Sequence, residues 1–224
     1  MSLTAVLISS PFLGPAVWSG VEAELREGFG TPATTVAVHD SDASDPDAIL
    51  AALRERLPPG EELLLVPHSN AGLYAPALAL DAPRRRVVFV DAILPPPNGT
   101  LPVAPPGLRD ALAAEADEDG LLPPWTGWWP ERVVDELFPD AATKASVEAG
   151  QRRMPLAYLD ARVEVPDGWD RAPAAYLAFG DAYADERDDA RSRGWPVETM
   201  DGGHLHMLRE PAAVAAAIIR LAAA

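Results

Sequence analysis

The chain has no cysteine, one lysine and no long apolar run, and these absences restrict what it can be. Without cysteine there is no disulfide, no thiolate nucleophile and no cysteine-bound metal. Basic residues are few: 18 Lys and Arg stand against 34 Asp and Glu, for a formal net charge of −16. Nucleic acid and anionic membranes select clustered positive charge, so neither is expected as a partner.

The N-terminal residues lack the basic start and cleavage site of a signal peptide, and no apolar stretch reaches the roughly 20 residues that span a bilayer. We therefore expect a cytoplasmic protein. Its 224 residues, 48% of them hydrophobic, suit one domain over residues 1–224.

Short apolar runs alternate with segments of helical spacing, which predicts an α/β fold with a mostly parallel sheet covered on both faces by helices. Ligands in such sheets bind at the carboxyl ends of the strands. Strands are expected at 3–9, 34–39, 63–66, 86–91, from 174 and at 196–200, and helices at 17–29, 46–57, 70–80, 144–154 and 211–223.

The strand–helix rhythm breaks between about residues 95 and 166, where proline clusters indicate stiff connectors. This segment is interpreted as a small cap insertion over the site. It holds Trp125, Trp128 and Trp129 close together, and these either anchor the cap to the body or line an apolar substrate pocket.

The apolar run at 63–66 ends at a serine, Ser69, between small residues, and a helical segment follows. This layout is typical of a nucleophile elbow, a strained strand-to-helix turn that exposes a serine Oγ. Ala71 fits the elbow, but Pro67 stands where glycine is usual. The alternative is that Ser69 only caps the following helix.

Two later segments supply the partners that a serine nucleophile needs. A strand near residue 174 ends in Gly180-Asp181, and His204 follows two glycines just before the last helix. Serine, acid and histidine thus occur in the chain order of α/β-hydrolases. Ser69, Asp181 and His204 are all expected at the carboxyl ends of strands.

Strand, elbow, capped insertion and terminal Gly-Gly-His together resemble the α/β-hydrolase superfamily, in particular its compact capped serine esterases. The resemblance implies an α/β-hydrolase fold and an oxyanion hole made by the backbone N–H groups of Asn70 and of a residue in the first loop. That first-loop position is occupied by Pro11, which has no N–H, so the expected substitute is the Phe12 N–H or, as alternatives, the Ser9 or Ser10 hydroxyl.

The resemblance also places the triad acid about three residues after the strand-ending glycine, where this chain has Tyr183. Asp181 is therefore the first choice, Asp185 the second, and Asp91, at the tip of the preceding strand, the third. The other histidines are given no catalytic role: His206 is expected to pack, His68 to serve structure, and His39 has no catalytic context.

The resulting prediction is a serine hydrolase acting on a small or medium apolar carboxylic ester or thioester, without a metal or organic cofactor. A homodimer would be compatible with an apolar face on an edge helix. The alternatives are a lyase, cyclase or isomerase on the same scaffold, favoured by Pro11, and a binding protein without turnover.

Overall fold

The computed structural model describes residues 3–39, 43–59, 62–81 and 84–224. Within them a six-stranded sheet has the order β2-β1-β3-β4-β7-β8, and every neighbouring pair is parallel. The mostly parallel sheet expected from the sequence is therefore confirmed. The strands are β1 (Thr4–Ile8), β2 (Ala33–Val36), β3 (Leu63–Ser69), β4 (Arg85–Ala92), β7 (Ala174–Phe179) and β8 (Val197–Met200).

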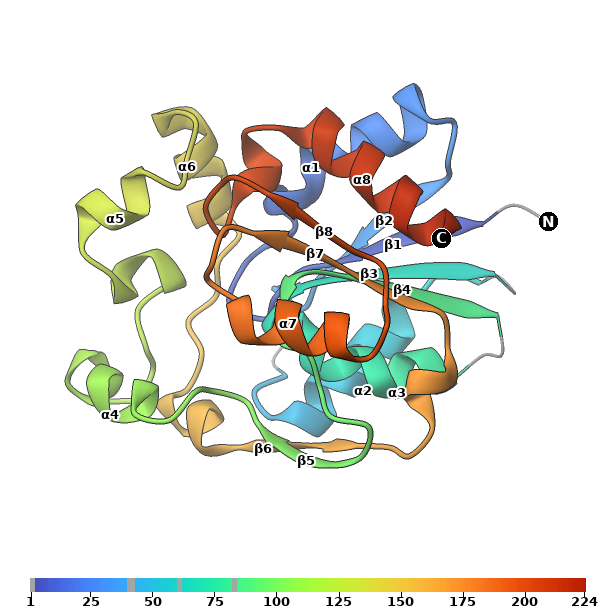
Figure 1. The fold of residues 1–224 in the computed structure, drawn as a ribbon. Coiled ribbons are helices and arrows are strands. Elements are labelled where there is room, and N and C mark those ends of the chain that lie inside the picture. The colour runs from blue at the N-terminus through green and yellow to red at the C-terminus, as the bar shows by residue number, and fades with distance from the viewer. Residues whose placement is uncertain (1–2, 40–42, 60–61, 82–83) are drawn as a thin grey trace.

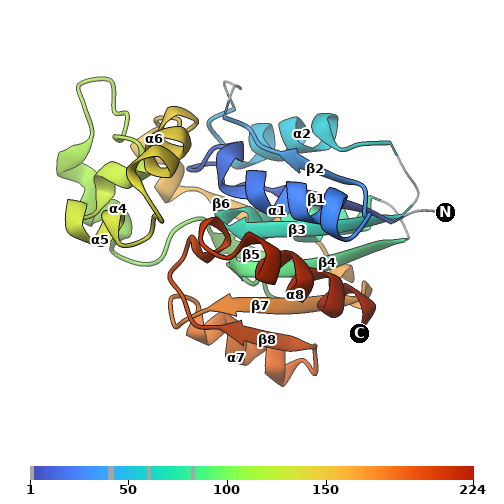
Figure 2. The same ribbon diagram turned by 90° about the horizontal axis from the view of Figure 1, so that it is seen from above.

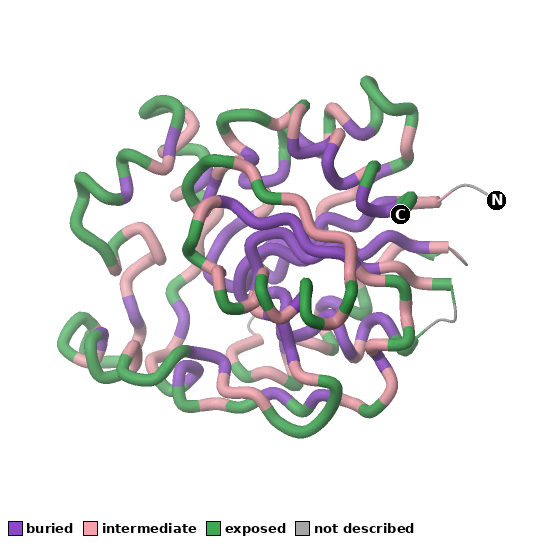
Figure 3. The backbone as a smooth tube through the Cα atoms, viewed as in Figure 1, coloured by how far each residue is buried: buried purple, intermediate pink, exposed green. Residues whose placement is uncertain are grey.

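The strands are apolar on both faces because both faces are covered, as is typical of parallel sheets. In β3, Leu63 and Leu65 pack into one core cluster, whereas Leu64 and Val66 pack into the other. Figure 3 shows the strands as the buried centre of the molecule. The sheet thus forms a rigid support whose carboxyl ends can hold a site.

Helices lie on both faces of the sheet (Figures 1 and 2), with α1 and α8 on one and α2, α3 and α7 on the other. Right-handed crossovers between parallel strands produce this arrangement. The elements are η1 (Pro15–Trp18), α1 (Ser19–Ala23), η2 (Glu24–Gly28), α2 (Pro46–Arg56), η3 (Asn70–Tyr74), α3 (Ala75–Leu80), α7 (Ala184–Ser192), η8 (His206–Leu208) and α8 (Pro211–Ala223).

The segment between β4 and β7 leaves the sheet. Its helices α4, α5 and α6 lie beyond the end toward which the strands run (Figures 1 and 2), and its two strands form a separate antiparallel pair. The elements are β5 (Gly99–Pro102), α4 (Leu108–Leu112), η4 (Ala113–Glu115), η5 (Trp125–Trp128), α5 (Glu131–Asp135), α6 (Ala141–Ala149), η6 (Leu156–Asp160), β6 (Arg162–Val165) and η7 (Trp169–Arg171).

Several boundaries differ from the sequence-based prediction. The helix expected over 70–80 divides into a 3₁₀ turn and α3, which begins just before Pro76. Proline is well tolerated in the first turn of a helix, so Pro76 starts α3 and does not kink it. The helix expected at 144–154 spans 141–149 because Asp140 caps it by accepting from the Thr143 N–H. In the described chain we find no helix with the length and apolarity to cross a bilayer.

Candidate active site

Ser69 is the last residue of β3 and lies in a strained turn. Its backbone has φ +57° and ψ −129°, and the β3–β4 register shifts between His68 and Ser69. Ser69 and Asp91 (φ +41°) are the two non-glycine residues with positive φ in the described part of the chain. Such strain concentrates at functional sites, where the surrounding structure enforces it. Pro67 does not prevent the turn, since β3 continues through it and pairs with Ile8 of β1.

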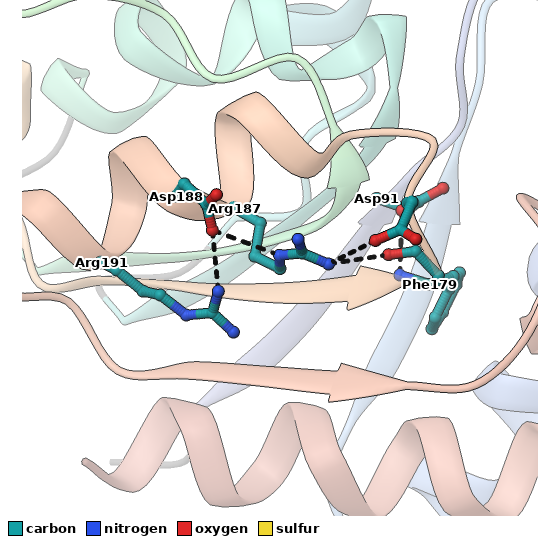
Figure 4. A network of polar contacts seen from close by, with 7 residues as sticks. Asp91, Phe179, Arg187, Asp188 and Arg191 are labelled. Carbon is teal, nitrogen blue, oxygen red and sulfur yellow. Dashed lines mark hydrogen bonds and ion pairs between the residues drawn. The ribbon is translucent and has the colours of Figure 1, made fainter.

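Asp91, near the end of β4, is fully buried and holds His204. One oxygen of this buried carboxylate lies 2.6 Å from His204 Nδ1. The other accepts from the Phe179 N–H at 2.9 Å (Figure 4). With Nδ1–H donating to Asp91, the neutral imidazole leaves Nε2 with a free lone pair. This is the tautomer that a general base requires, and the buried carboxylate also stabilises the imidazolium.

The structure places the expected acid, Asp181, elsewhere. The Asp181 side chain is 87% exposed and pairs with Arg187 at 3.0 Å, within a surface cluster that continues to Asp188 and Arg191 (Figure 4). Asp185 is also exposed, in the first turn of α7. Asp91, the third choice from the sequence, is the carboxylate that His204 contacts, and the structure brings neither Asp181 nor Asp185 to this imidazole. The reason is geometric: the chain after Gly180 turns outward into α7.

His68 precedes Ser69 in β3 and packs against His204. Its ring stacks on the His204 ring with centroids 4.5 Å apart, and its Nε2–H donates to the His204 carbonyl at 3.0 Å. His68 is fully buried, and its pKa lies well below the ordinary 6.5 because burial penalises the charged ring and His204 adds to the effect. His68 is therefore neutral and structural.

The depressed pKa of His68 predicts acid sensitivity. Above about pH 6.5 both folded and unfolded chains hold this ring neutral, whereas below it the unfolded chain takes up a proton that the folded chain resists. The contribution of neutral His68 to the free energy of unfolding is thus present above that pH, and it is lost as the pH falls toward the pKa that His68 has in the folded protein. We expect wild type to exceed His68→Gln in free energy of unfolding by less at about pH 5 than at about pH 7.5, as measured by urea unfolding. A gap that stays constant would contradict this.

Asn70 follows Ser69, and two hydrogen bonds fix its side chain. Its Nδ2 donates to the Val103 carbonyl at 2.7 Å, and its Oδ1 accepts from the Tyr158 hydroxyl at 2.7 Å. Tyr74 lies 2.8 Å from that hydroxyl and donates to it, because the Tyr158 proton is already used. Asn70 begins a 3₁₀ helix, so its backbone N–H has no acceptor within that helix. The network connects the elbow to the insertion and was not predicted from the sequence.

The first loop supplies the other expected oxyanion donor. Phe12 N–H lies 3.4 Å from Ser10 Oγ, a long contact that leaves the N–H free to find a better acceptor. The Phe12 ring packs edge-on against Trp128 at 4.8 Å and Tyr158 at 5.5 Å. Whether Phe12 and Asn70 form an oxyanion hole stays a prediction.

The three tryptophans divide between two positions. The Trp125 ring centroid lies 6.0 Å from that of His204, whereas Trp128 packs against Phe12 of the first loop. Trp128 is anchored by a hydrogen bond from Nε1 to the Pro123 carbonyl at 2.8 Å. Trp129 is 41% exposed and packs edge-on against Trp125. Trp125 is therefore the tryptophan that the structure places beside His204.

Tyr183 is the site residue that sequence reasoning did not assign. Its hydroxyl lies 3.5 Å from Ser69 Oγ, and its ring centroid is 5.5 Å from that of His204. The signal in the sequence is that Tyr183 stands at the position where the resemblance implies an acid.

The remaining histidines lie away from Ser69. His206 packs edge-on against Phe179, and His39 is exposed. Across the described ranges, no group of three or more His, Asp or Glu side chains is arranged to hold a metal ion.

Comparison with known proteins identifies the fold. No protein-family model and no curated protein sequence matches the chain. Among solved structures it is similar to an extracellular α/β-hydrolase from a Paenibacillus species (TM-score 0.72, 18% identity, 98% of this chain and 99% of that one). It is also similar to a variant of polyneuridine aldehyde esterase (TM-score 0.71, 16% identity, 98% of each chain covered). A third similar structure is a tomato methylketone synthase I variant (TM-score 0.61, 16% identity, 100% of this chain and 98% of that one). The chain therefore has the α/β-hydrolase fold.

Proposed function

We propose that the protein is a serine hydrolase in which Ser69, His204 and Asp91 form the catalytic triad. The observation that carries the proposal is the buried Asp91–His204 contact of 2.6 Å, next to a serine with positive φ. A buried carboxylate and a strained serine each cost stability. General-base catalysis accounts for both, because it requires an imidazole held in one tautomer beside the serine. The fold shared with an esterase supports the same chemistry by analogy.

In this mechanism Ser69 Oγ attacks the acyl carbon while its proton passes to His204 Nε2. Asp91 stabilises the resulting imidazolium, and the N–H of Asn70, with that of Phe12, donates to the oxyanion. His204 then returns the proton to the leaving group, and water releases the acyl group by the reverse sequence. Catalytic hydrogen bonds are often long before substrate binds and shorten in the Michaelis complex, which is how Ser69 would reach His204.

The proposed substrate is a small or medium carboxylic ester or thioester. Its apolar part would lie against Trp125, whose ring is 6.0 Å from that of His204, and against Trp128, which packs on Phe12 of the first loop. Aromatic side chains bury large apolar surfaces and suit such a group. We also keep the sequence-based prediction of a cytoplasmic enzyme that needs no cofactor.

The test is intact-mass analysis after exposure to a fluorophosphonate. Wild type should gain one adduct, and Ser69→Ala and His204→Ala should gain none, since the first lacks the nucleophile and the second its base. Circular dichroism of both variants would verify that they are folded. A folded wild-type protein that gains no adduct would exclude the hydrolase.

A second candidate is a non-hydrolytic enzyme on the same site. Pro11 favours it, because a first loop with proline at the oxyanion position offers one backbone donor fewer, and removing one such donor typically costs about 10²–10³ in rate. The similarity to a methylketone synthase is compatible with it. A Ser69 adduct without turnover of any ester or thioester would favour a lyase, cyclase or isomerase. A ligand-binding role predicts binding that Ser69→Ala leaves unchanged.

A further inference from the structure

Tyr183 places a phenol next to the nucleophile. The residue lies in the loop between β7 and α7, at the position just before that helix begins. The 3.5 Å between its hydroxyl and Ser69 Oγ is the long limit of a hydrogen bond, so a better acceptor would displace this contact readily. A substrate oxygen bonded to the carbon that Ser69 attacks would lie within reach of both groups.

The order of the sheet decides which substrate oxygen that is. Phe12 follows β1 on one side of β3, whereas Tyr183 follows β7 and His204 follows β8, both on the other side. Phe12 and Tyr183 therefore approach Ser69 from opposite sides of β3, while Asn70 directly follows Ser69. Tyr183 shares its side with His204, whose ring is 5.5 Å away, and the leaving group departs toward the residue that protonates it.

The phenol is suited to donate a hydrogen bond without losing its proton. Burial raises the pKa of Tyr183 well above its ordinary value of 10, and the carboxylates of Asp91 and Glu186 raise it further. Tyr183 is therefore protonated at every pH at which the enzyme would operate. Its single O–H is available to an acceptor in the site.

We propose that Tyr183 is a catalytic residue that hydrogen-bonds the leaving-group oxygen, and that the substrates are alkyl esters. The inference deepens the proposed function and rests on it. An alkoxide is a poor leaving group and gains most from a second donor, whereas aryloxides and thiolates leave as stable anions. The phenol would add little to a thioester, so its presence favours the alkyl ester.

Ser69 Oγ has formed its bond to the acyl carbon, and His204 carries the serine proton on Nε2. As the bond from the acyl carbon to the leaving oxygen breaks, that oxygen keeps the electron pair and takes the proton from His204, while Tyr183 donates a hydrogen bond to it and retains its own proton. The products are the acyl-enzyme and the free alcohol.

The test compares Tyr183→Phe with wild type on alkyl and p-nitrophenyl esters of one carboxylic acid. The readout is kcat/KM, which reports acylation. For the alkyl ester, kcat/KM should fall about tenfold, which corresponds to the loss of one hydrogen bond. For the p-nitrophenyl ester, kcat/KM should change by less than about threefold. Fluorophosphonate labelling of Tyr183→Phe should persist, because fluoride leaves without help, and this shows that the variant is folded.

Tyr176→Phe is the matched control, since it removes another buried hydroxyl, one that bonds the backbone of Ala92 and not Ser69. Its effect should be equal on both esters. Equal losses on both esters, or no loss, in Tyr183→Phe would overturn the assignment. A wild-type protein without a fluorophosphonate adduct would instead overturn the proposed function, so the two failures are distinguishable.

Discussion

Replacing Asp91 with asparagine should lower the rate of fluorophosphonate labelling at Ser69 by about 10⁴-fold. The Asp91 carboxylate accepts two hydrogen bonds, one from His204 Nδ1–H and one from the Phe179 N–H. An asparagine amide has only one accepting oxygen, so it cannot replace both oxygens of the carboxylate. An asparagine that keeps the Phe179 bond through its oxygen turns its amide N–H₂ toward Nδ1. His204 would then carry its proton on Nε2 and could no longer accept from Ser69.

The matched control is Asp181→Asn, the same chemical change at the acid that the sequence favoured. Asp181 is exposed and pairs with Arg187 at the surface, where water screens the ion pair and its contribution to stability is small. Its labelling rate should stay within about twofold of wild type. A large loss in Asp181→Asn with little loss in Asp91→Asn would reverse the assignment of the acid.

The choice between these carboxylates shows where sequence reasoning stops. Ser69 and His204 could be identified because each stands in a local pattern, a strand-ending serine among small residues and a histidine after two glycines. Asp91 and Asp181 both follow apolar strands, and β4 and β7 are neighbours in the sheet. Which of them reaches His204 depends on the positive φ of Asp91 and on the outward turn after Gly180, and neither has a sequence signature.

The insertion shows a second limit of the same kind. The parallel strands could be predicted from their apolar runs, but β5 and β6 are four-residue strands that contain glycine, proline and charged residues. Their pairing brings Val103 and Tyr158 to Asn70, residues that are far apart in the chain. Only the tertiary fold creates that network, so a sequence can supply its members but not their contacts.

The division of roles around Ser69 follows from the same sheet. A strained backbone holds Ser69 at the end of β3, the buried Asp91 orients His204, and residues of the insertion fix Asn70. Because Asp91 on β4 contacts His204, the loop after β7 need not supply a carboxylate to this histidine, and it places Tyr183 beside Ser69 instead.

Gly72→Ala should destabilise the protein by about 3 kcal/mol or more, which for a domain of this size lowers Tm by roughly 6–12 °C. A Cβ at this position would lie 2.0 Å from the Ile93 carbonyl oxygen, a backbone atom that cannot rotate away. Gly72 and Ile93 follow the two strained strand ends, and the Ile93 N–H donates to the Ser69 carbonyl at 3.1 Å. Separating the two segments would therefore also displace Ser69 and reduce its labelling.

Gly28→Ala provides the comparison, because it adds the same methyl group at an exposed helical glycine. The new Cβ would lie 3.2 Å from Glu24 Oε2, the end of a flexible side chain that can move. Alanine also favours the helix over glycine by up to about 1 kcal/mol, so Tm should stay constant or rise. Differential scanning calorimetry of the two variants measures the contrast. Equal Tm values would mean that the segment after the elbow can relax, and that the close approach of Gly72 to Ile93 is not what holds Ser69 in its strained conformation.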